Sequence, residues 1–268
     1  MSFGTKLANT RRLLGMTQEK LAEQIGVSTE AVSKWERDRY SPDPDKLARL
    51  DEVLDLPLRD KNGELQNARF FHEDHMSAYL KGKLNATDYP NALAALQCAK
   101  DKHAGAVRKG PAKVPYINHP LTMACHALAL GLTDDALLAA LLLHDVSEDC
   151  FVAPEDLPVC KEAQEIVRLV TKPKDRTHFS DKEYYKAISA VPKASLVKCI
   201  DRCNNLSSMP SGMTDMQIAS YVRETEKYYP ELLRVVKACP EYNSAAWLLT
   251  YQMRSLMAMA KRIRQIQV

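Results

Sequence analysis

The sequence predicts an all-α protein built from two helical domains. Glycine is scarce, with 9 among 268 residues, and segments of alternating polar and β-branched residues are almost absent. Apolar residues instead recur three and four positions apart, as in Leu121, Ala124, Cys125, Leu128 and Ala129. A polar stretch over residues 59–67, with Asn62-Gly63 at its centre, is typical of a linker. We therefore expect domains over residues 1–60 and 67–268, joined near residues 57–67.

The composition excludes several classes of protein. Hydrophobic residues make up 46% of the chain and charged residues 26%, which is ordinary for a globular protein, and the formal net charge of +3 identifies no partner. No run of about 18 apolar residues predicts a transmembrane helix, and the N-terminus lacks the apolar segment of a signal peptide. The seven cysteines form no CxxC pair, which favours reduced thiols. We expect a cytoplasmic protein.

The first domain carries the pattern of a helix-turn-helix. Thr17 is a good N-cap for an amphipathic helix that Gly26 ends, and Ser28 caps a second helix that runs to Arg37. Their inward-facing apolar residues are Leu21, Ala22, Ile25, Ala31, Val32 and Trp35. Two short helices joined by a glycine-containing turn are the arrangement that places a second helix in the DNA major groove.

The segment MTQEKLAEQIGVSTEAVSKWERDRYSPDPDKLARL resembles the phage-repressor-like (Cro/C1, XRE) helix-turn-helix family, over about residues 4–57. The resemblance implies that DNA is contacted by Gln18, Thr29, Glu30, Ser33, Lys34 and Arg37, with Arg11, Arg37 and Arg39 as candidates for phosphate. Residues 1–40 hold seven basic and five acidic side chains, and residues 41–60 hold three and six, so the domain has a charge of about −1. A module for dimerisation or protein contact therefore stays open as the alternative.

The second domain contains side chains suited to a divalent metal. His119, the pair His144-Asp145 and Asp201 offer imidazole and carboxylate donors. Adjacent residues diverge by about 100° on a helix, so His144 and Asp145 can reach one ion only at a helix end or with the ion between helices. Four such ligands leave room for water and substrate. Glu148 lies four residues after His144, which predicts the same helical face and suits a general base.

The order of these groups is similar to the signature of HD-superfamily phosphohydrolases. Three segments, AKDKHAGAVRKGPAKVPYINHPLTMA, AALLLHDVSED and ASLVKCIDRCNNL, further resemble the hydrolase domain of RelA/SpoT proteins. They are most similar to the small alarmone hydrolases, over about residues 70–240. The resemblance implies hydrolysis of the 3′-pyrophosphate of an alarmone such as ppGpp.

The same resemblance implies a role for individual residues. The metal, usually Mn²⁺ in that family, would be bound by His119, His144, Asp145 and Asp201. Glu148 and Asp149 would polarise the attacking water, and the substrate would be bound by Arg108, Lys109 and Asn205. Tyr116 and His103 are either pocket residues or structural ones. Lys198 either reaches phosphate or is a solvated lysine.

The match to the alarmone hydrolases has departures that leave alternatives open. Ser207 stands where many members carry an arginine, and Cys150 stands where threonine is common. Adenine alarmones and removal of the NADPH 2′-phosphate therefore remain alternative activities. A regulator whose HD domain only senses a nucleotide, and a nucleotidase for dNTPs or dNMPs, are two further alternatives. The apolar, then basic C-terminal segment predicts a last helix that packs on the core or mediates homodimerisation.

Overall fold

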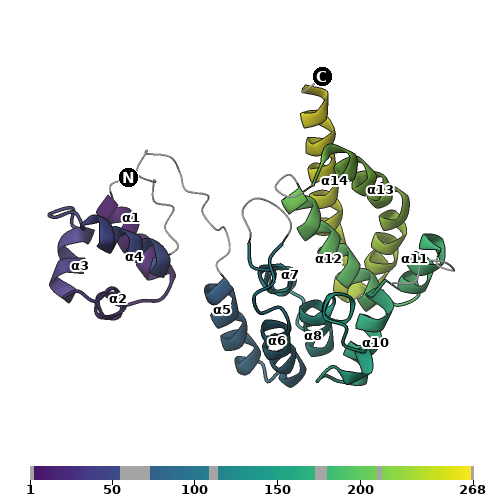
Figure 1. The fold of residues 1–268 in the computed structure, drawn as a ribbon, viewed down its shortest axis with the longest axis horizontal. Coiled ribbons are helices and arrows are strands. Elements are labelled where there is room, and N and C mark those ends of the chain that lie inside the picture. Colours follow the sequence, from purple (N-terminus) through teal and green to yellow (C-terminus); the bar gives the residue numbers. More distant parts are fainter. Residues whose placement is uncertain (1–2, 55–72, 109–113, 173–179, 210–212, 267–268) are drawn as a thin grey trace. The chain divides into compact units, whose positions relative to one another are not determined.

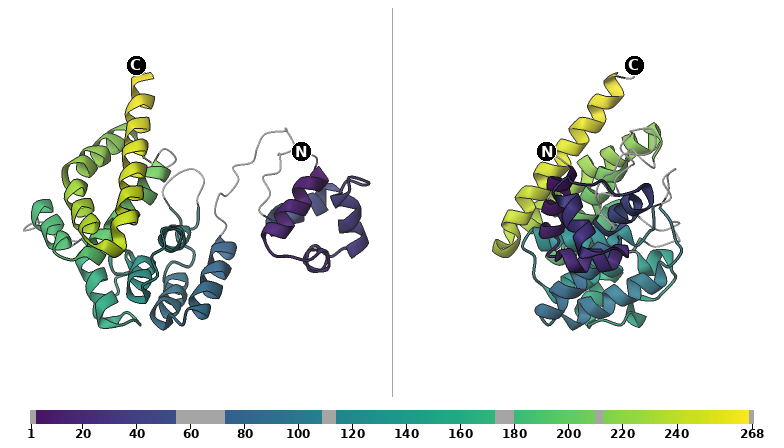
Figure 2. Two further views of the ribbon diagram at one scale, coloured as in Figure 1. Left: turned by 180° about the vertical axis from the view of Figure 1, so that it is seen from behind. Right: turned by 90° about the vertical axis from the view of Figure 1, so that its left-hand side faces the viewer.

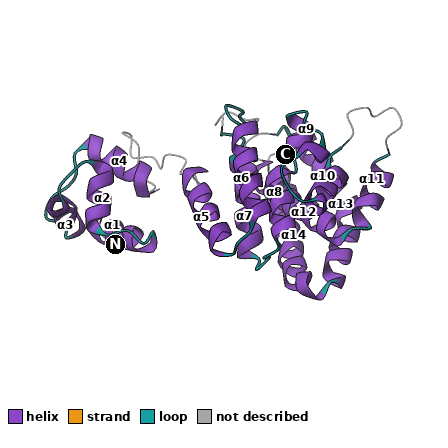
Figure 3. Cartoon of the chain, turned by 90° about the horizontal axis from the view of Figure 1, so that it is seen from below, coloured by secondary structure: helices purple, strands orange, loops and turns teal. Residues whose placement is uncertain are grey.

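The computed structural model describes residues 3–54, 73–108, 114–172, 180–209 and 213–266. Contacts divide the chain into two compact units, Met1–His72 and Glu73–Val268. The predicted join at residues 57–67 lies outside the described residues. Within the described residues every regular element is a helix, which confirms the all-α prediction (Figures 1 and 3). None of these helices is long and apolar enough to cross a membrane.

The first unit contains α1 (Phe3–Leu13), α2 (Gln18–Ile25), α3 (Thr29–Glu36) and α4 (Pro44–Leu54). The predicted caps are confirmed: Thr17 Oγ1 accepts from Lys20 N at 3.2 Å, and Ser28 Oγ accepts from Ala31 N at 3.2 Å. Gly26 ends α2 with a φ of 73°, a left-handed conformation that favours glycine. The buried core of the unit is formed by Leu7, Leu21, Ala22, Ile25, Val32, Trp35, Leu50 and Leu54.

The second unit is built around α8 (Asp135–Leu143), in which every residue after Asp135 is buried. This helix packs against α6 (Pro90–Lys102), α7 (Asn118–Ala129), α10 (Lys161–Val170) and α12 (Pro192–Ser208). Its all-apolar sequence, DALLAALLL, fits a helix that is surrounded on several sides. The C-terminal end of α8 therefore lies in the interior of the unit.

The remaining helices complete the second unit around this core. They are α5 (Glu73–Ala86), α9 (Val146–Asp149), α11 (Asp181–Ser189), α13 (Asp215–Ala238) and α14 (Asn243–Ile266). Helices α12, α13 and α14 pack against one another, and the C-terminal turns of α14, yellow in the ribbon, project beyond them (Figures 1 and 2). Two short 3₁₀ turns, at Pro154–Asp156 and Pro240–Tyr242, join helices. All seven cysteines are free, as predicted.

Candidate metal centre

Helix α8 ends at Leu143, so His144 and Asp145 lie just beyond its last residue. This is the first of the two arrangements that allow adjacent side chains to face one ion. The ring Nδ1 of His144 forms a hydrogen bond with the carbonyl of Leu141 at 2.9 Å. In a continuing α-helix this carbonyl would accept from the backbone N–H of residue 145. The prediction that His144 and Glu148 share one helix face was therefore wrong, because Glu148 lies on the separate short helix α9.

Four donor atoms from three helical segments converge beside the end of α8. His119 Nε2 lies 3.2 Å from Asp201 Oδ1 and 3.6 Å from Asp145 Oδ2. His144 Nε2 lies 3.0 Å from Asp145 Oδ2 and 3.8 Å from Asp201 Oδ1. Donor atoms of His119, His144 and Asp201 all lie within 4.8 Å of one another, and all three residues are buried. Side chains 82 positions apart in the sequence, His119 and Asp201, thus share one site.

The opposite nitrogens of both imidazoles are held by hydrogen bonds. His119 Nδ1 lies 2.6 Å from Asn204 Oδ1, and His144 Nδ1 bonds to Leu141 O. With acceptors at both Nδ1 positions, each ring carries its proton there, and each Nε2 offers a lone pair to the centre. Asn204 was not predicted from the sequence, where only its neighbour Asn205 was singled out. Its position one helical turn after Asp201 on α12 was the available signal.

The donor set fits a divalent cation. His144 Nε2 is buried and forms no hydrogen bond with any described residue, although it lies close to Asp145. A buried polar atom without a partner is costly, and a bound ion would satisfy it. Burial alone would raise the pKa of Asp201, but the neighbouring Lys198 ammonium holds this pKa well below its usual range. The carboxylate therefore stays ionised, as a metal ligand requires.

Several predicted substrate residues border the same centre. The Tyr116 hydroxyl donates to Asp145 Oδ2 at 2.6 Å. Arg108 Nη2 donates to Asn205 Oδ1 at 2.7 Å, and Asn205 Nδ2 donates to Asp201 Oδ1 at 2.5 Å. A chain of polar contacts therefore connects Arg108 to a carboxylate of the candidate metal centre. Lys109 lies outside the described residues.

Lys198 is half-buried and paired rather than solvated. Its Nζ donates to Asp201 Oδ2 at 3.2 Å, and its side chain is 14% exposed. Burial opposes its charge, but nearby tyrosine hydroxyls and Asp201 raise the pKa of Lys198 well above its usual value. The ammonium therefore balances part of the negative charge at the centre.

The two acidic residues of α9 differ in exposure. Glu148 is half-buried, and its Oε2 accepts a hydrogen bond from the backbone N of Lys172 at 3.3 Å, whereas Asp149 is exposed. The Lys172 ammonium is in turn paired with Glu224 Oε1 at 3.1 Å and with Asp181 Oδ1 at 3.5 Å. Lys172 was not predicted from the sequence, because its contact with Glu148 spans 24 residues.

The candidate DNA-contacting residues lie on the outer surface of the first unit. Glu30, Lys34 and Arg37 are exposed, and Thr29 and Ser33 are half-buried on the same helix, α3. Two of them form an i,i+4 ion pair, Lys34 Nζ to Glu30 Oε1 at 3.0 Å, and Arg37 bonds to Ser33.

Two other candidates on this unit are engaged with Glu36. Arg11 is buried and donates to both Glu36 oxygens, at 2.6 Å and 3.0 Å, so its prediction as a phosphate contact was wrong. Gln18 Nε2 donates to Glu36 Oε2 at 2.7 Å. Arg11 sits at the interface of α1 and α3, where its charge needs an internal partner.

Comparison with known proteins gives a match for the first unit. Residues 7–61 match the helix-turn-helix family HTH_3. This range contains α2, the turn at Gly26 and α3.

Curated relatives of the chain are alarmone hydrolases by name. The guanosine-3′,5′-bis(diphosphate) 3′-pyrophosphohydrolase MESH1 of Xenopus tropicalis is 34% identical over 145 residues, covering 51% of this chain and 81% of that protein. MESH1 of Homo sapiens is 33% identical over 138 residues, covering 48% of this chain and 77% of its own length. The bifunctional (p)ppGpp synthase/hydrolase SpoT of Escherichia coli K12 is 33% identical over 145 residues, with 20% of its length covered.

A solved structure shares the fold. It is described as a metazoan ortholog of SpoT that hydrolyzes ppGpp. It matches with a TM-score of 0.51 and 23% identity, covering 63% of this chain and 95% of its own.

Proposed function

The chain belongs to the family of MESH1-type guanosine-3′,5′-bis(diphosphate) 3′-pyrophosphohydrolases, and from this membership we propose that it hydrolyses the 3′-pyrophosphate of an alarmone nucleotide. The observation that carries the proposal is the convergence of two imidazole nitrogens and two carboxylate oxygens on one buried point. A site that only senses a nucleotide has no need of such a donor set, because it has no water to activate.

We propose that His119, His144, Asp145 and Asp201 hold one divalent cation, with Mn²⁺ as the ion to test first. Mixed imidazole and carboxylate donors suit Mn²⁺, Fe²⁺ or Zn²⁺ more than Ca²⁺. The ion, when bound, supplies the Lewis acidity that makes water a better nucleophile at neutral pH. Tyr116 orients one of the ligands, because its hydroxyl donates to the Asp145 oxygen that faces both histidines.

Other polar side chains of the chain accept the proton of the water and bind the substrate. Glu148, held by the Lys172 N–H, accepts the proton of the attacking water, and the exposed Asp149 helps to orient that water. Arg108 binds the phosphates through its guanidinium, and Asn205 positions Arg108 against Asp201. Lys198 acts indirectly, since its ammonium is paired with Asp201. The products are a nucleoside 5′-diphosphate or 5′-triphosphate and pyrophosphate.

The test is pyrophosphate or phosphate release from ppGpp, ppApp and NADPH, with and without Mn²⁺, by the full chain. We expect Mn²⁺-dependent release of pyrophosphate from one alarmone and its loss in Asp145→Ala and Glu148→Ala. Glu155→Gln, a change at an exposed carboxylate of the same unit, is the control. Binding of nucleotide without turnover would instead support a sensing domain.

We further propose that the helix-turn-helix unit binds DNA, with Thr29, Ser33, Lys34 and Arg37 facing the groove. The exposure of Lys34 and Arg37 supports this assignment. Glu30 reduces the positive charge that Lys34 offers to DNA, because the two side chains form an ion pair. Substituting Arg37→Ala should weaken binding to operator DNA and lower the slope of log K against log salt by about 1. If adding the protein at low salt leaves the electrophoretic mobility of DNA from upstream of the gene unchanged, the unit binds another protein instead.

Two copies of the chain are the expected DNA-binding form, since helix-turn-helix proteins read paired half-sites. Helix α14 offers a surface for self-association, because Trp247 and Tyr251 are 63% and 61% exposed and stack at 5.9 Å. Sedimentation of the full chain and of Trp247→Ala measures this. A monomer at micromolar concentration would remove the proposal.

A further inference from the structure

A short antiparallel ribbon carries Arg108 and Tyr116 toward the metal centre. Val107 and Pro115 form a β-bridge, Arg108 N donates to Val114 O at 2.8 Å, and Tyr116 N donates to Ala106 O at 2.8 Å. Side chains alternate between the two faces of extended backbone. Arg108 and Tyr116 therefore share the face toward the centre, and Val107 and Pro115 share the reverse face.

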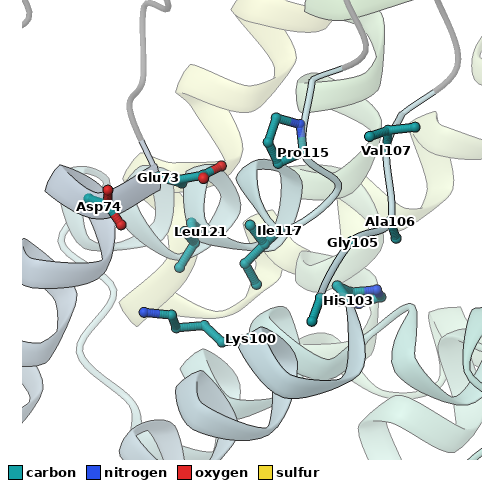
Figure 4. A pocket seen from close by; sticks show the side chains of 11 residues that line it. Glu73, Asp74, Lys100, His103, Gly105, Ala106, Val107, Pro115, Ile117 and Leu121 are labelled. Carbon is teal, nitrogen blue, oxygen red and sulfur yellow. The ribbon is translucent and has the colours of Figure 1, made fainter. Parts of the chain in front are cut away.

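A cavity of about 280 Å³, partly open to solvent, borders this ribbon, and Val107 and Pro115 are among its lining residues. It is bordered by the N-terminal end of α5, the C-terminal end of α6, the ribbon and α7 (Figure 4). The lining residues that carry the argument are Glu73, Asp74, Lys100, His103, Ile117 and Leu121. The residues at the metal centre, by contrast, are His119, His144, Asp145 and Asp201, none of which lines the cavity.

Two buried polar atoms of the lining have no hydrogen-bond partner among the described residues. They are Glu73 Oε2 and His103 Nε2, and His103 is 3% exposed. Buried polar atoms are paired as a rule, so two such atoms lining one cavity indicate that something else pairs with them. Because they come from α5 and from the end of α6, a single ligand would have to span the cavity.

The charge of the lining selects the ligand. Glu73 supplies a carboxylate with one buried, unpartnered oxygen, and the one lining ammonium, that of Lys100, donates to Ser77 Oγ at 3.2 Å. Burial lowers the pKa of His103, so its ring adds no positive charge at neutral pH. Figure 4 shows the two acids at one end of the cavity, and the apolar side chains of Leu121 and Ile117 between them and His103.

We propose that this cavity binds a small organic amine, and that its occupancy alters alarmone binding at the metal centre. The ammonium pairs with Glu73, and the carbon chain lies along Leu121 and Ile117. A polar group at the far end of the ligand bonds to His103 Nε2. The cavity is slightly below the range of about 300–1,000 Å³ that is usual for drug-sized ligands, which fits a molecule of roughly ten heavy atoms or fewer.

The link to the metal centre rests on the proposed function and runs through one aromatic contact. The His103 ring packs against the Tyr116 ring at 4.7 Å with an interplanar angle of 32°. The Tyr116 hydroxyl donates to Asp145 Oδ2. A ligand that holds His103 and the reverse face of the ribbon therefore restricts Tyr116 and Arg108, which face the substrate.

The test begins with binding alone, without nucleotide or turnover. Methyl resonances of Ile117 and Leu121 in the full chain are followed while 5-aminopentan-1-ol, pentane-1,5-diol or 5-hydroxypentanoate is added. We expect saturation by the amine with a Kd on the order of 1 mM, since about seven heavy atoms supply limited affinity. Binding of the alcohol and the carboxylate should be at least about tenfold weaker, because neither can pair with Glu73 as a cation.

Three variants sharpen the result. Glu73→Gln should weaken amine binding about tenfold, Ala104→Leu should abolish it by filling the cavity, and Glu155→Gln should leave it unchanged. Equal binding of the three probes, or no saturable shift of either methyl group, overturns the site whatever the enzyme does. In the active enzyme, saturating 5-aminopentan-1-ol should change the alarmone KM at least about twofold, but not in Glu73→Gln. An unchanged KM overturns the coupling, and absence of turnover with intact amine binding counts only against the proposed function.

Discussion

The two units of this chain both bury charged side chains, but they leave them in different states. In the helix-turn-helix unit, the Arg11 and Glu36 side chains are 9% and 6% exposed and are joined by two hydrogen bonds, with Gln18 bonded to the same carboxylate. In the second unit, Asp145 and Asp201 converge on two histidines, and His144 Nε2 is left without a hydrogen bond.

This difference separates a structural ion pair from a binding site. Burying a charge is costly, and a protein offsets that cost by pairing the charge internally or with a ligand. The partners of Glu36, the last residue of α3, come from α1 and α2, so this group of side chains joins three helices. Around His144 one buried nitrogen has no hydrogen-bond partner among the described residues, and a bound cation would satisfy it. The predictions below test this distinction.

The largest effect is expected at the metal centre. Asp201→Asn removes a charged donor and should lower kcat more than about 10³-fold, as should chelation of the wild type, with Mn²⁺ restoring only the latter. Steady-state pyrophosphate release measures both, and circular dichroism checks the fold. Asp156→Asn, at an exposed position, is the matched control. Full activity of Asp201→Asn would show that Asp201 is no ligand.

The second effect is expected in the first unit and concerns stability alone. Glu36→Gln leaves the Arg11 charge buried without a counter-ion and should destabilise this unit by about 3 kcal/mol. The fluorescence of Trp35, which is buried in the same unit, follows its unfolding in urea. Glu30→Gln breaks an exposed pair and should cost less than about 1 kcal/mol. Alarmone hydrolysis should be unchanged in both variants, and a loss of kcat in Glu36→Gln would contradict the separation of the two units.

A third, smaller effect is expected at Asn204. Asn204→Ala frees the His119 ring and should raise the Mn²⁺ concentration for half-maximal activity about 10–100-fold. Asn204→Asp keeps an acceptor at Nδ1 and should restore most of the metal affinity. The exposed Ser207→Ala, on the same helix, is the control. Identical Mn²⁺ curves for wild type and Asn204→Ala would show that this hydrogen bond does not orient the ring.

The smallest effect is expected at Glu224, which pairs with Arg202 at 2.9 Å and with Lys172. Burial opposes its charge, but Arg202 and Lys172 lower the pKa of Glu224 to about 2. A depressed folded-state pKa stabilises the protein above the unfolded value near 4.3, and this stabilisation is lost as the pH falls toward 2. Glu224→Gln should therefore cost about 2 kcal/mol at pH 7, after allowance for solvent screening. Urea unfolding at pH 7 and pH 3 measures the change, and a difference that does not shrink at pH 3 would contradict the ion pair.

Local signals predicted α2 and α3 of the first unit closely. Thr17, Ser28 and Gly26 act within a few residues of themselves, through a side-chain cap or a left-handed φ, so their effects follow from the sequence. The prediction that one helix continues from His144 to Glu148 was wrong. Apolar periodicity does not indicate that the His144 side chain forms a hydrogen bond with the backbone carbonyl of Leu141.

The sequence by itself determined the all-α class, the helix-turn-helix, and the residue types and order of the candidate metal ligands. The all-α class follows from apolar periodicity, the helix-turn-helix from signals between neighbouring residues, and the candidate ligands from the order of their motifs in the sequence. Tertiary structure decided which side chains meet: His119 with Asn204, 85 residues apart, and Arg11 with Glu36, 25 apart. It also decided that a cavity lies behind the ribbon that carries Tyr116. Such contacts depend on how the helices pack. Many polar residues elsewhere in the chain could form a chemically equivalent hydrogen bond, so the sequence alone does not show which two residues meet.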